Sequence, residues 1–395
     1  MVELTTKIYK ALDKRRSSLA VFVDLAKAFD TVDHERLLNV LENMGFRGVP
    51  HSLLKDYLAN RLQCVRVNQE LSDTKTVQCG VPQGTVLGPI LFNIYLNSLF
   101  SLNVGGDAIS FADDTVIFFE DENWDLLKTK VENNMEIFFH YFSKNLLTVN
   151  FSKTYFVPFT SFSSNLPNYN SINVFKNCNC INTKIDMTIK GKYLGITIDA
   201  HLRWESQVLA VTKKVRSLLY KFKYLQKNFT IPNLKILYHA LVEPHLTYGI
   251  LAWGGITNNY VTPLEKVQKW VLKVIFTKKR SYPSNDLFEE SKLLDIRGHF
   301  CLSILTKQHN EKTALNLVEH NYETRHKEHQ FRTPLIAKTV TQRSYYYLGP
   351  YIFNKIPGDF KSIISKDLFK KRIKNWILSN TRTYINSLVD LKNVV

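Results

Sequence analysis

Short apolar runs alternate with amphipathic segments along the first 200 residues. The run 19–23 is apolar throughout and ends at Asp24, which predicts a buried strand. Downstream, Leu37, Leu41 and Met44 lie at helical spacing after Asp33, which predicts a helix that begins at this N-cap. The same pattern predicts these further elements: a helix over 51–61, a hairpin of 64–68 with 74–78, a helix over 90–100, helical segments after residue 120 that lead to a strand ending at 159, a polar surface loop over 160–184, and one strand over 192–199.

Residues 109–120 contain two apolar runs on either side of the adjacent carboxylates Asp113 and Asp114. Both runs are rich in β-branched and aromatic residues, so they predict a hairpin with the acidic pair at its turn. Because Asp-Asp is also a suitable turn dipeptide, the pair alone fits an ordinary turn equally well.

Helical periodicity replaces this pattern after residue 200. Between 207 and 227, apolar residues recur at steps of three and four, which predicts an amphipathic helix packed on a core. Further helices are predicted over 234–251, 264–276 and 368–378, with a turn-rich stretch before the last of them. Basic residues lie off the apolar stripe of the first helix, among them Lys213, Lys214, Arg216, Lys221 and Lys223.

The positive charge of the chain is concentrated in its second half. Residues 1–200 contain 20 Lys and Arg against 21 Asp and Glu, a net charge of −1. Residues 201–395 contain 32 against 14, a net charge of +18, and the two halves sum to +17. This asymmetry favours a polyanionic partner, above all nucleic acid, and a solubilising surface is the alternative.

The remaining composition indicates a folded intracellular protein, in the nucleus or the cytoplasm. An apolar content of 45% and a charged content of 22% are typical of globular chains. No apolar run approaches the roughly 20 residues that span a bilayer, and the first residues lack the apolar centre of a signal peptide. The five cysteines are an odd number, which favours free thiols, and Cys178 and Cys180 lack the partners that a zinc site requires.

Asp24, Asp113 and Asp114 are the candidate catalytic residues. If the three carboxylates converge on one face of a sheet, they repel one another, and two bound divalent cations would remove this repulsion. Oxygen ligands suit Mg²⁺, with Mn²⁺ as a substitute, and two such ions activate a hydroxyl and stabilise a pyrophosphate leaving group. The alternative is that Asp24 forms a cap or salt bridge while the acidic pair only turns a hairpin.

Five segments resemble, in this order, the palm motifs of reverse transcriptases, most closely those of jockey-like non-LTR retrotransposons. The resemblance extends from about residue 5 nearly to the end, because residues 241–255, 264–276 and 344–357 resemble C-terminal regions of that group. The palm segments are residues 21–38 (VFVDLAKAFDTVDHERLL), 80–97 (GVPQGTVLGPILFNIYLN), 111–119 (FADDTVIFF), 145–159 (NLLTVNFSKTYFVPF) and 192–204 (KYLGITIDAHLRW).

The resemblance implies a role for each matching residue. Asp24, the Leu25 carbonyl, Asp113 and Asp114 match the metal-binding positions. Phe29 matches the aromatic gate that excludes a ribose 2′-hydroxyl and so selects deoxynucleotides. Gln83 and Gly84 match the turn that positions the incoming nucleotide, and Lys153 matches a lysine near the pyrophosphate, where it would donate a proton. An ordinary surface lysine is the alternative for Lys153.

The resemblance further implies an α+β fold, with a right-hand polymerase palm whose antiparallel sheet carries helices on one face. It divides the chain into a fingers remnant (1–20), a palm (21–200), a helical thumb (201–285) and a helical C-terminal region (286–395). The activity implied is RNA-directed DNA synthesis from dNTPs on an RNA template and a DNA primer, with the basic helix gripping the nucleic acid. The sequence makes no prediction about oligomeric state.

Two departures from the family pattern leave alternatives open. Only about 20 residues precede Phe22, so the fingers motifs and an endonuclease domain are not present, and we expect a fragment of a longer protein. A catalytically impaired remnant that binds nucleic acid is therefore the second hypothesis. An RNA-dependent RNA polymerase is a third, and Phe29 and Ala112 argue against it.

Overall fold

The computed structural model describes residues 1–102, 104–162, 165–174, 183–311 and 331–390, and the predicted absence of a zinc site at Cys178 and Cys180 falls outside these ranges. Within them the chain forms two compact units. One comprises residues 16–193 and the other comprises residues 1–15 with 194–395.

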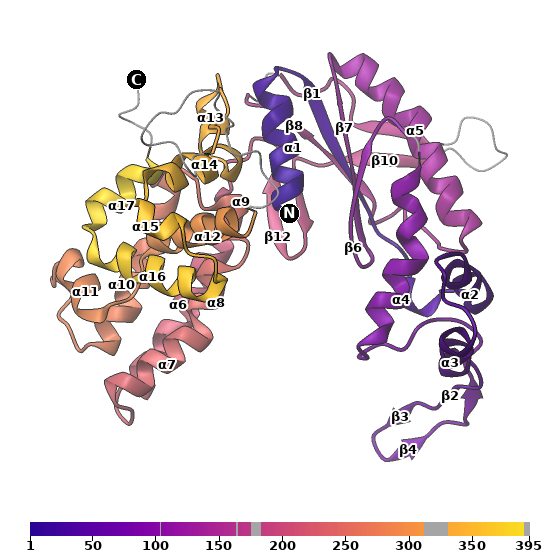
Figure 1. Cartoon of the computed structure of the whole chain (residues 1–395), viewed down its shortest axis with the longest axis horizontal. Helices are drawn as coiled ribbons and strands as arrows, with labels where there is room; N and C mark the ends of the chain where they lie inside the picture. Colours follow the sequence, from indigo (N-terminus) through magenta and orange to yellow (C-terminus); the bar gives the residue numbers. More distant parts are fainter. Residues whose placement is uncertain (103, 163–164, 175–182, 312–330, 391–395) are drawn as a thin grey trace. The chain divides into compact units, whose positions relative to one another are not determined.

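The first unit, the sheet unit (residues 16–193), is built on a six-stranded sheet in the order β6-β7-β1-β8-β10-β9. Every pairing is antiparallel except that of β8 with β10. In Figure 1, β1 lies between β7 and β8. This confirms the predicted α+β class. The strands are β1 (Ser17–Val23), β6 (Asp107–Phe111), β7 (Asp114–Asp121), β8 (Tyr155–Phe159), β9 (Ser171–Val174) and β10 (Thr183–Met187).

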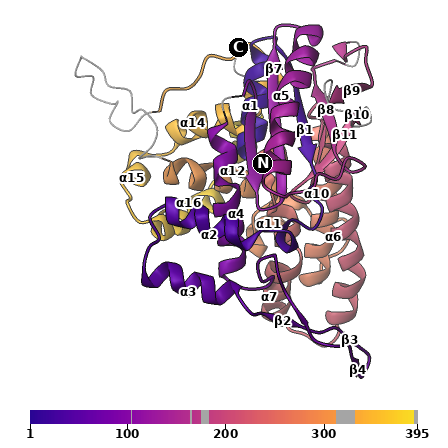
Figure 2. The ribbon, with the colours of Figure 1, turned by 90° about the vertical axis from the view of Figure 1, so that its right-hand side faces the viewer.

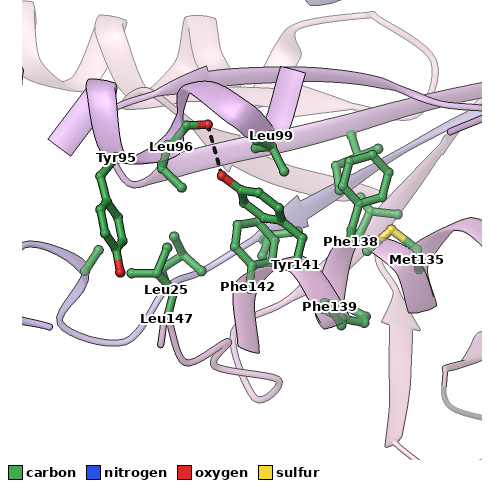
Figure 3. Packing of buried hydrophobic residues seen from close by; sticks show 14 of the residues in the cluster. Leu25, Tyr95, Leu96, Leu99, Met135, Phe138, Phe139, Tyr141, Phe142 and Leu147 are labelled. Atoms are coloured by element: carbon green, nitrogen blue, oxygen red, sulfur yellow. Dashed lines mark hydrogen bonds between the residues drawn. The ribbon is translucent and has the colours of Figure 1, made fainter. Parts of the chain in front are cut away.

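Helix α5 (Trp124–Lys144) supplies most of the core that covers one face of this sheet. Its Phe138 and Phe142 are fully buried together with Leu19 and Val21 of β1. Figure 3 shows Phe138 and Phe142 of this core, together with the hydroxyl of Tyr141, which donates a hydrogen bond to the Leu96 carbonyl at 3.3 Å. The core also receives side chains from α2 (His34–Asn43), α3 (Val49–Leu58) and α4 (Leu87–Leu96), and η2 (Asn97–Ser101) follows α4.

The predicted N-cap at Asp33 is confirmed, and a hairpin forms where one was predicted, but its pairing differs because Glu70 and Leu71, expected between the two strands, are themselves paired. The Asp33 carboxylate caps α2 by accepting a hydrogen bond from the Arg36 amide at 2.9 Å. The hairpin consists of two short ladders, β2 (Leu62–Gln63) with β5 (Lys75–Thr76) and β3 (Arg66–Val67) with β4 (Glu70–Leu71). Figure 2 shows β3 and β4 at its far end.

Two predictions about the end of the sheet unit are wrong. The segment 160–184, predicted as a loop, contains β9 and the start of β10, because Ile172 and Val174 are buried in the core despite their polar neighbours. The single strand predicted over 192–199 is divided into β11 (Lys190–Tyr193) and β12 (Ile196–Asp199). The backbone of Leu194 and Gly195 is left-handed there, with φ of 49° and 75°, which ends an extended strand.

The second unit, the helical unit (residues 1–15 and 194–395), is almost entirely helical. The basic amphipathic helix is confirmed as α6 (Glu205–Leu225), with Val208, Val215 and Phe222 buried. It packs along α10 (Asn258–Ile275), and α12 (Ile296–Asn310) packs against α14 and α16. The others are α1 (Val2–Asp13), α7 (Ile231–Leu241), α8 (Glu243–Thr247), α9 (Ile250–Trp253), α11 (Ser284–Ser291), α13 (Thr339–Gln342), α14 (Tyr345–Lys355), α15 (Gly358–Lys361), α16 (Lys366–Ser379) and α17 (Arg382–Val389).

The helix predicted over 234–251 is wrong as a single element. Pro244 and the left-handed Gly249 (φ 61°) divide it into α7, α8 and α9. The stretch predicted as turn-rich instead holds α14, which continues through Pro350. Within the described residues, no helix is long and apolar enough to cross a membrane.

Candidate active site

Asp24 occupies the position immediately after β1, and its backbone is fixed by a distant turn. Its amide donates a hydrogen bond to the Thr154 hydroxyl at 3.3 Å, and its carbonyl accepts one from the Asn150 amide at 2.8 Å. The Thr154 hydroxyl in turn donates to the Asn150 carbonyl at 2.9 Å. Because Thr154 is buried, this turn holds the Asp24 backbone in one position while its side chain stays partly exposed.

The predicted acidic hairpin is formed by β6 and β7. Ala112 is left-handed, with φ of 54°, and Asp113 follows it in the turn. Asp114 is already the first residue of β7, where it is paired with Phe111. The turn is tightened by the Ser110 hydroxyl, which donates to the Ala112 carbonyl at 2.9 Å. The two carboxylates are therefore held differently, one by a turn and one by a strand.

The register of β1 against β7 brings the first carboxylate next to the hairpin. Phe22 pairs with Val116 and Val23 pairs with Thr115, so the next step of the register brings Asp24 opposite Asp114. Cross-strand partners in an antiparallel pair point to the same face of the sheet. Asp24 and Asp114, 90 residues apart in the sequence, thus share one face at the end of β1.

The charges of these side chains act on one another. Partial burial, together with the negative charges of Asp113 and Asp24, raises the pKa of the Asp114 carboxyl. Lys153 is the neighbouring cation, with its Nζ 3.9 Å from Asp24 Oδ2. Both side chains of that pair are exposed, 69% for Lys153 and 41% for Asp24, and such exposed pairs contribute little. The negative charge at the site is therefore only weakly compensated.

The carbonyl of Leu25 is directed away from the strand-like segment beside it. Leu25 and Val149 form an antiparallel bridge. The hydrogen bonds of this bridge flank the pair, from the Ala26 amide to the Thr148 carbonyl and from Asn150 to Asp24, both at 2.8 Å. In this arrangement the paired residues point their own N–H and C=O groups outward. The Leu25 carbonyl therefore points away from Val149 and takes no part in the hydrogen bonds of this bridge.

The three carboxylates suit a divalent cation because of their negative charge. Asp24, Asp113 and Asp114 supply hard oxygen donors whose mutual repulsion a cation would relieve, which suits Mg²⁺. Across the described ranges, however, no three His, Cys, Asp or Glu side chains are already gathered as a metal centre. The donor set therefore fits such ions chemically, and the side chains would have to close around them.

Phe29, Gln83 and Gly84 belong to a second cluster, where the turn after β1 meets the loop before α4. The Phe29 ring stacks on Phe92 with centroids 4.6 Å apart, and its carbonyl accepts a hydrogen bond from the Val81 amide. Gln83 Nε2 donates to Asp30 Oδ1 at 2.9 Å. Gly84 has φ of 75° and open space around it, so the backbone there is accessible to a ligand.

Three residues that sequence reasoning missed support these clusters. Thr154 orients Asp24, and Asp30 anchors Gln83. Gly80 permits the contact between the two segments, because a Cβ there would lie 2.8 Å from the Asp30 carbonyl oxygen. No local pattern marks Thr154, since its partner is 130 residues away.

The predicted nucleic-acid-binding residues of α6 are all exposed. Lys213, Lys214, Arg216, Lys221 and Lys223 lie off the buried stripe, as the periodicity requires. Two tyrosines that we did not predict share their surface, Tyr220 with 79% and Tyr224 with 64% of the side chain exposed. This helix belongs to the helical unit, whereas the carboxylates belong to the sheet unit.

Comparisons with known proteins agree with the predicted family. A family model described as reverse transcriptase (RNA-dependent DNA polymerase) matches residues 3–198. Two similar relatives are probable RNA-directed DNA polymerases of Drosophila melanogaster: that from transposon BS is 26% identical over 69% of this chain and 30% of the relative, and that from transposon X-element is 25% identical over 68% of this chain and 29% of the relative. The RNA-directed DNA polymerase from mobile element jockey of Drosophila funebris is 24% identical over 67% of this chain and 29% of the relative. The chain thus spans about 30% of the length of these relatives.

A weaker likeness links the chain to a solved structure of telomerase from Candida albicans. It covers 74% of this chain and 52% of that chain, with 12% sequence identity and a TM-score of 0.33.

Proposed function

Because residues 3–198 of this chain belong to the reverse transcriptase family, within the non-LTR retrotransposon group, we propose that the chain carries out RNA-directed DNA synthesis. The reaction would join a dNTP to a primer 3′-hydroxyl with release of pyrophosphate. The observation that carries this proposal is the register of β1 on β7, which brings Asp24 beside Asp114 and the adjacent Asp113.

Asp24, Asp113 and Asp114, with the Leu25 carbonyl, would hold two Mg²⁺ or Mn²⁺ ions. Such ions, when bound, lower the pKa of the attacking hydroxyl and stabilise charge on the leaving group. The raised pKa of Asp114 supports this assignment, because a site with unbalanced negative charge gains most from a cation.

The remaining residues of the site would position the nucleotide. Phe29, held against Phe92, would exclude a ribose 2′-hydroxyl, and this stacking supports the role because a gate must be rigid. Gln83, anchored by Asp30, and the open backbone of Gly84 would contact the nucleotide and the template base. Lys153, within 3.9 Å of Asp24, would donate a proton to the departing pyrophosphate.

Template and primer would be held by the basic surface of α6 through phosphate contacts. Its five Lys and Arg residues are exposed on one helix, and Tyr220 and Tyr224 add two exposed rings. Phosphate contacts of this kind provide affinity without sequence preference.

Primer extension on poly(rA)/oligo(dT) with Mg²⁺ tests the proposal. The wild-type chain should extend the primer, and Asp114→Asn should abolish extension. Asp121→Asn is the matched control, because Asp121 lies at the other end of the same strand and is paired with Lys130. Equal extension by wild type and Asp114→Asn would disprove the two-metal assignment.

A second candidate function is nucleic-acid binding without synthesis. The separation of the basic helix and the carboxylates into different compact units favours it, since α6 presents its charges whether or not the carboxylates bind metal. Binding of poly(rA)/oligo(dT) by a chain that shows no extension would select this candidate.

A further inference from the structure

A cavity of about 930 Å³ lies within the helical unit, and no part of the proposed reaction uses it. Its walls come from α1, the C-terminal part of α12, the segment 331–335 and α14. Its volume falls within the range of pockets that bind small molecules and cofactors. Arg332 and Leu335 are exposed at its edge, so the cavity opens to solvent along this segment.

The charged side chains that line the cavity are mainly basic. Two acidic residues, Glu3 and Glu311, face four basic ones, namely Lys7, Lys10, Lys307 and Arg332. Lys307 is paired with Glu311 at 2.5 Å, and the positive charges of Lys10 and Arg332 outnumber the single negative charge of Glu3. Such a wall suits a phosphate group.

Aromatic rings lie beside these cations. The Lys10 Nζ lies 4.6 Å from the centroid of the Tyr346 ring, which remains partly exposed. Tyr345 is fixed, because its hydroxyl donates to Glu311 Oε2 at 2.5 Å. Rings interleaved with Lys and Arg are typical of surfaces that stack the bases of single-stranded nucleic acid and hold its phosphates.

A buried amide at the cavity adds an unsatisfied donor. Gln308 lines the cavity and is 1% exposed. Its Oε1 lies 3.3 Å from the hydroxyl oxygen of Tyr345, whose single proton is directed to Glu311, and its Nε2 has no partner among the residues that the structure describes. A buried donor without a partner is destabilising, and an acceptor on a ligand would remove that cost. The edges of all four bases carry such acceptors.

We propose that this cavity holds one nucleotide unit of a single-stranded nucleic acid. The base stacks on Tyr346 and accepts a hydrogen bond from Gln308, and the phosphates lie against Lys10 and Arg332. Because these contacts require an unstacked, unpaired base, a duplex does not occupy the cavity. The strand continues over the exposed segment that carries Leu335. This site does not depend on polymerase activity.

The first test measures the binding of a labelled 12-nucleotide single-stranded RNA by the full chain. Lys10→Gln/Arg332→Gln should weaken binding about tenfold at 0.15 M salt and lower the salt slope by about 1.4, as expected for two lost phosphate contacts. Lys370→Gln/Lys371→Gln removes the same charge from exposed positions of α16 and should change affinity less than twofold. An unchanged affinity for the first variant, or equal losses for both, would overturn the proposal.

The second test locates the contact directly. An RNA carrying 4-thiouridine should crosslink to the peptide that contains Tyr346, and Tyr346→Leu should remove that crosslink while unfolding at the same temperature as wild type. Crosslinks confined to other peptides would overturn the proposal, as would equal protection of that peptide by duplex RNA. Competition by uridine 5′-monophosphate identifies the source of the nucleotide. If uridine 5′-monophosphate displaces the labelled RNA as well as the unlabelled oligonucleotide does at the same concentration, the proposal that the cavity holds part of a strand is wrong. Displacement by the oligonucleotide alone supports the proposal.

Discussion

Substitution of Gly80 by alanine perturbs the second cluster, in which Gln83 and Gly84 are proposed to position the nucleotide. Gly80 has φ of 89°, and an added Cβ would lie 2.8 Å from the carbonyl oxygen and 2.9 Å from the Cα of Asp30. Both contacts are with backbone, which cannot rotate away. The carbonyl of Gly80 also accepts a hydrogen bond from His34 Nε2 at 2.8 Å, so the glycine cannot shift without a further loss.

The expected magnitude has two parts. A left-handed backbone costs an L-residue about 1–2 kcal/mol, partly offset by about 0.4–1 kcal/mol because alanine restricts the unfolded chain. Overpacking against fixed backbone adds about 1–3 kcal/mol. Gly45 supplies the control, because its φ is 98° and nothing lies within 4 Å of its added Cβ. We therefore expect Gly80→Ala to lower the free energy of unfolding by about 3 kcal/mol and Gly45→Ala by about 1 kcal/mol.

Urea unfolding followed by far-ultraviolet circular dichroism measures both values. Primer extension provides the second readout. Gly80→Ala should lower kcat/KM for the incoming dNTP, because the loop that carries Gln83 must move away from Asp30, and Gly45→Ala should leave it unchanged. Equal losses of stability in the two variants would refute the predicted backbone clash.

Three further predictions follow from single contacts at the site. Thr154→Val removes the hydroxyl that accepts from the Asp24 amide and should cost about 1 kcal/mol of stability in urea unfolding and reduce extension, whereas Thr154→Ser should retain both. The pKa of Asp114 is higher in the folded chain than in the unfolded chain, so ionisation of its carboxyl lowers the free energy of unfolding. This loss of stability begins as the pH rises through the unfolded pKa and is complete above the folded pKa. Asp114→Asn should therefore match wild-type stability below pH 3.8 and exceed it at pH 7 in thermal unfolding, while a constant difference across pH would contradict this sign. Phe29→Val should raise incorporation of ribonucleotides relative to deoxynucleotides, and unaltered discrimination would exclude Phe29 as the gate.

Several local features followed from the sequence without any tertiary information. The strand before Asp24, the Asp33 cap of α2 and the hairpin around Asp113 each depend on residues within a few positions of one another. The helix α6 is of the same kind, because its buried stripe and its basic surface are both set by helical periodicity. Such features are recognisable from residues that are close together in the chain.

Other elements misled the sequence interpretation because their surroundings decided them. Residues 171–174 are flanked by polar residues, yet they form β9, since pairing with β10 and burial in the core outweigh their local composition. The extended pattern of 192–199 hid a left-handed turn at Leu194 and Gly195, which ordinary periodicity does not reveal. Likewise, α14 continues through Pro350, so a proline within the segment did not mark its end.

The sequence by itself determined which residues are candidates for the chemistry, because Asp24, Asp113, Asp114 and the basic residues of α6 stand in local patterns. Only the tertiary structure decided which of them meet. The register of β1 on β7 brings Asp24 to Asp114, and the turn at Thr154 fixes the Asp24 backbone from 130 residues away. The cavity beside Gln308 likewise exists only where α1, α12 and α14 come together. The physical reason is that periodicity and turn chemistry act over a few residues, whereas strand register and packing join segments far apart in the chain.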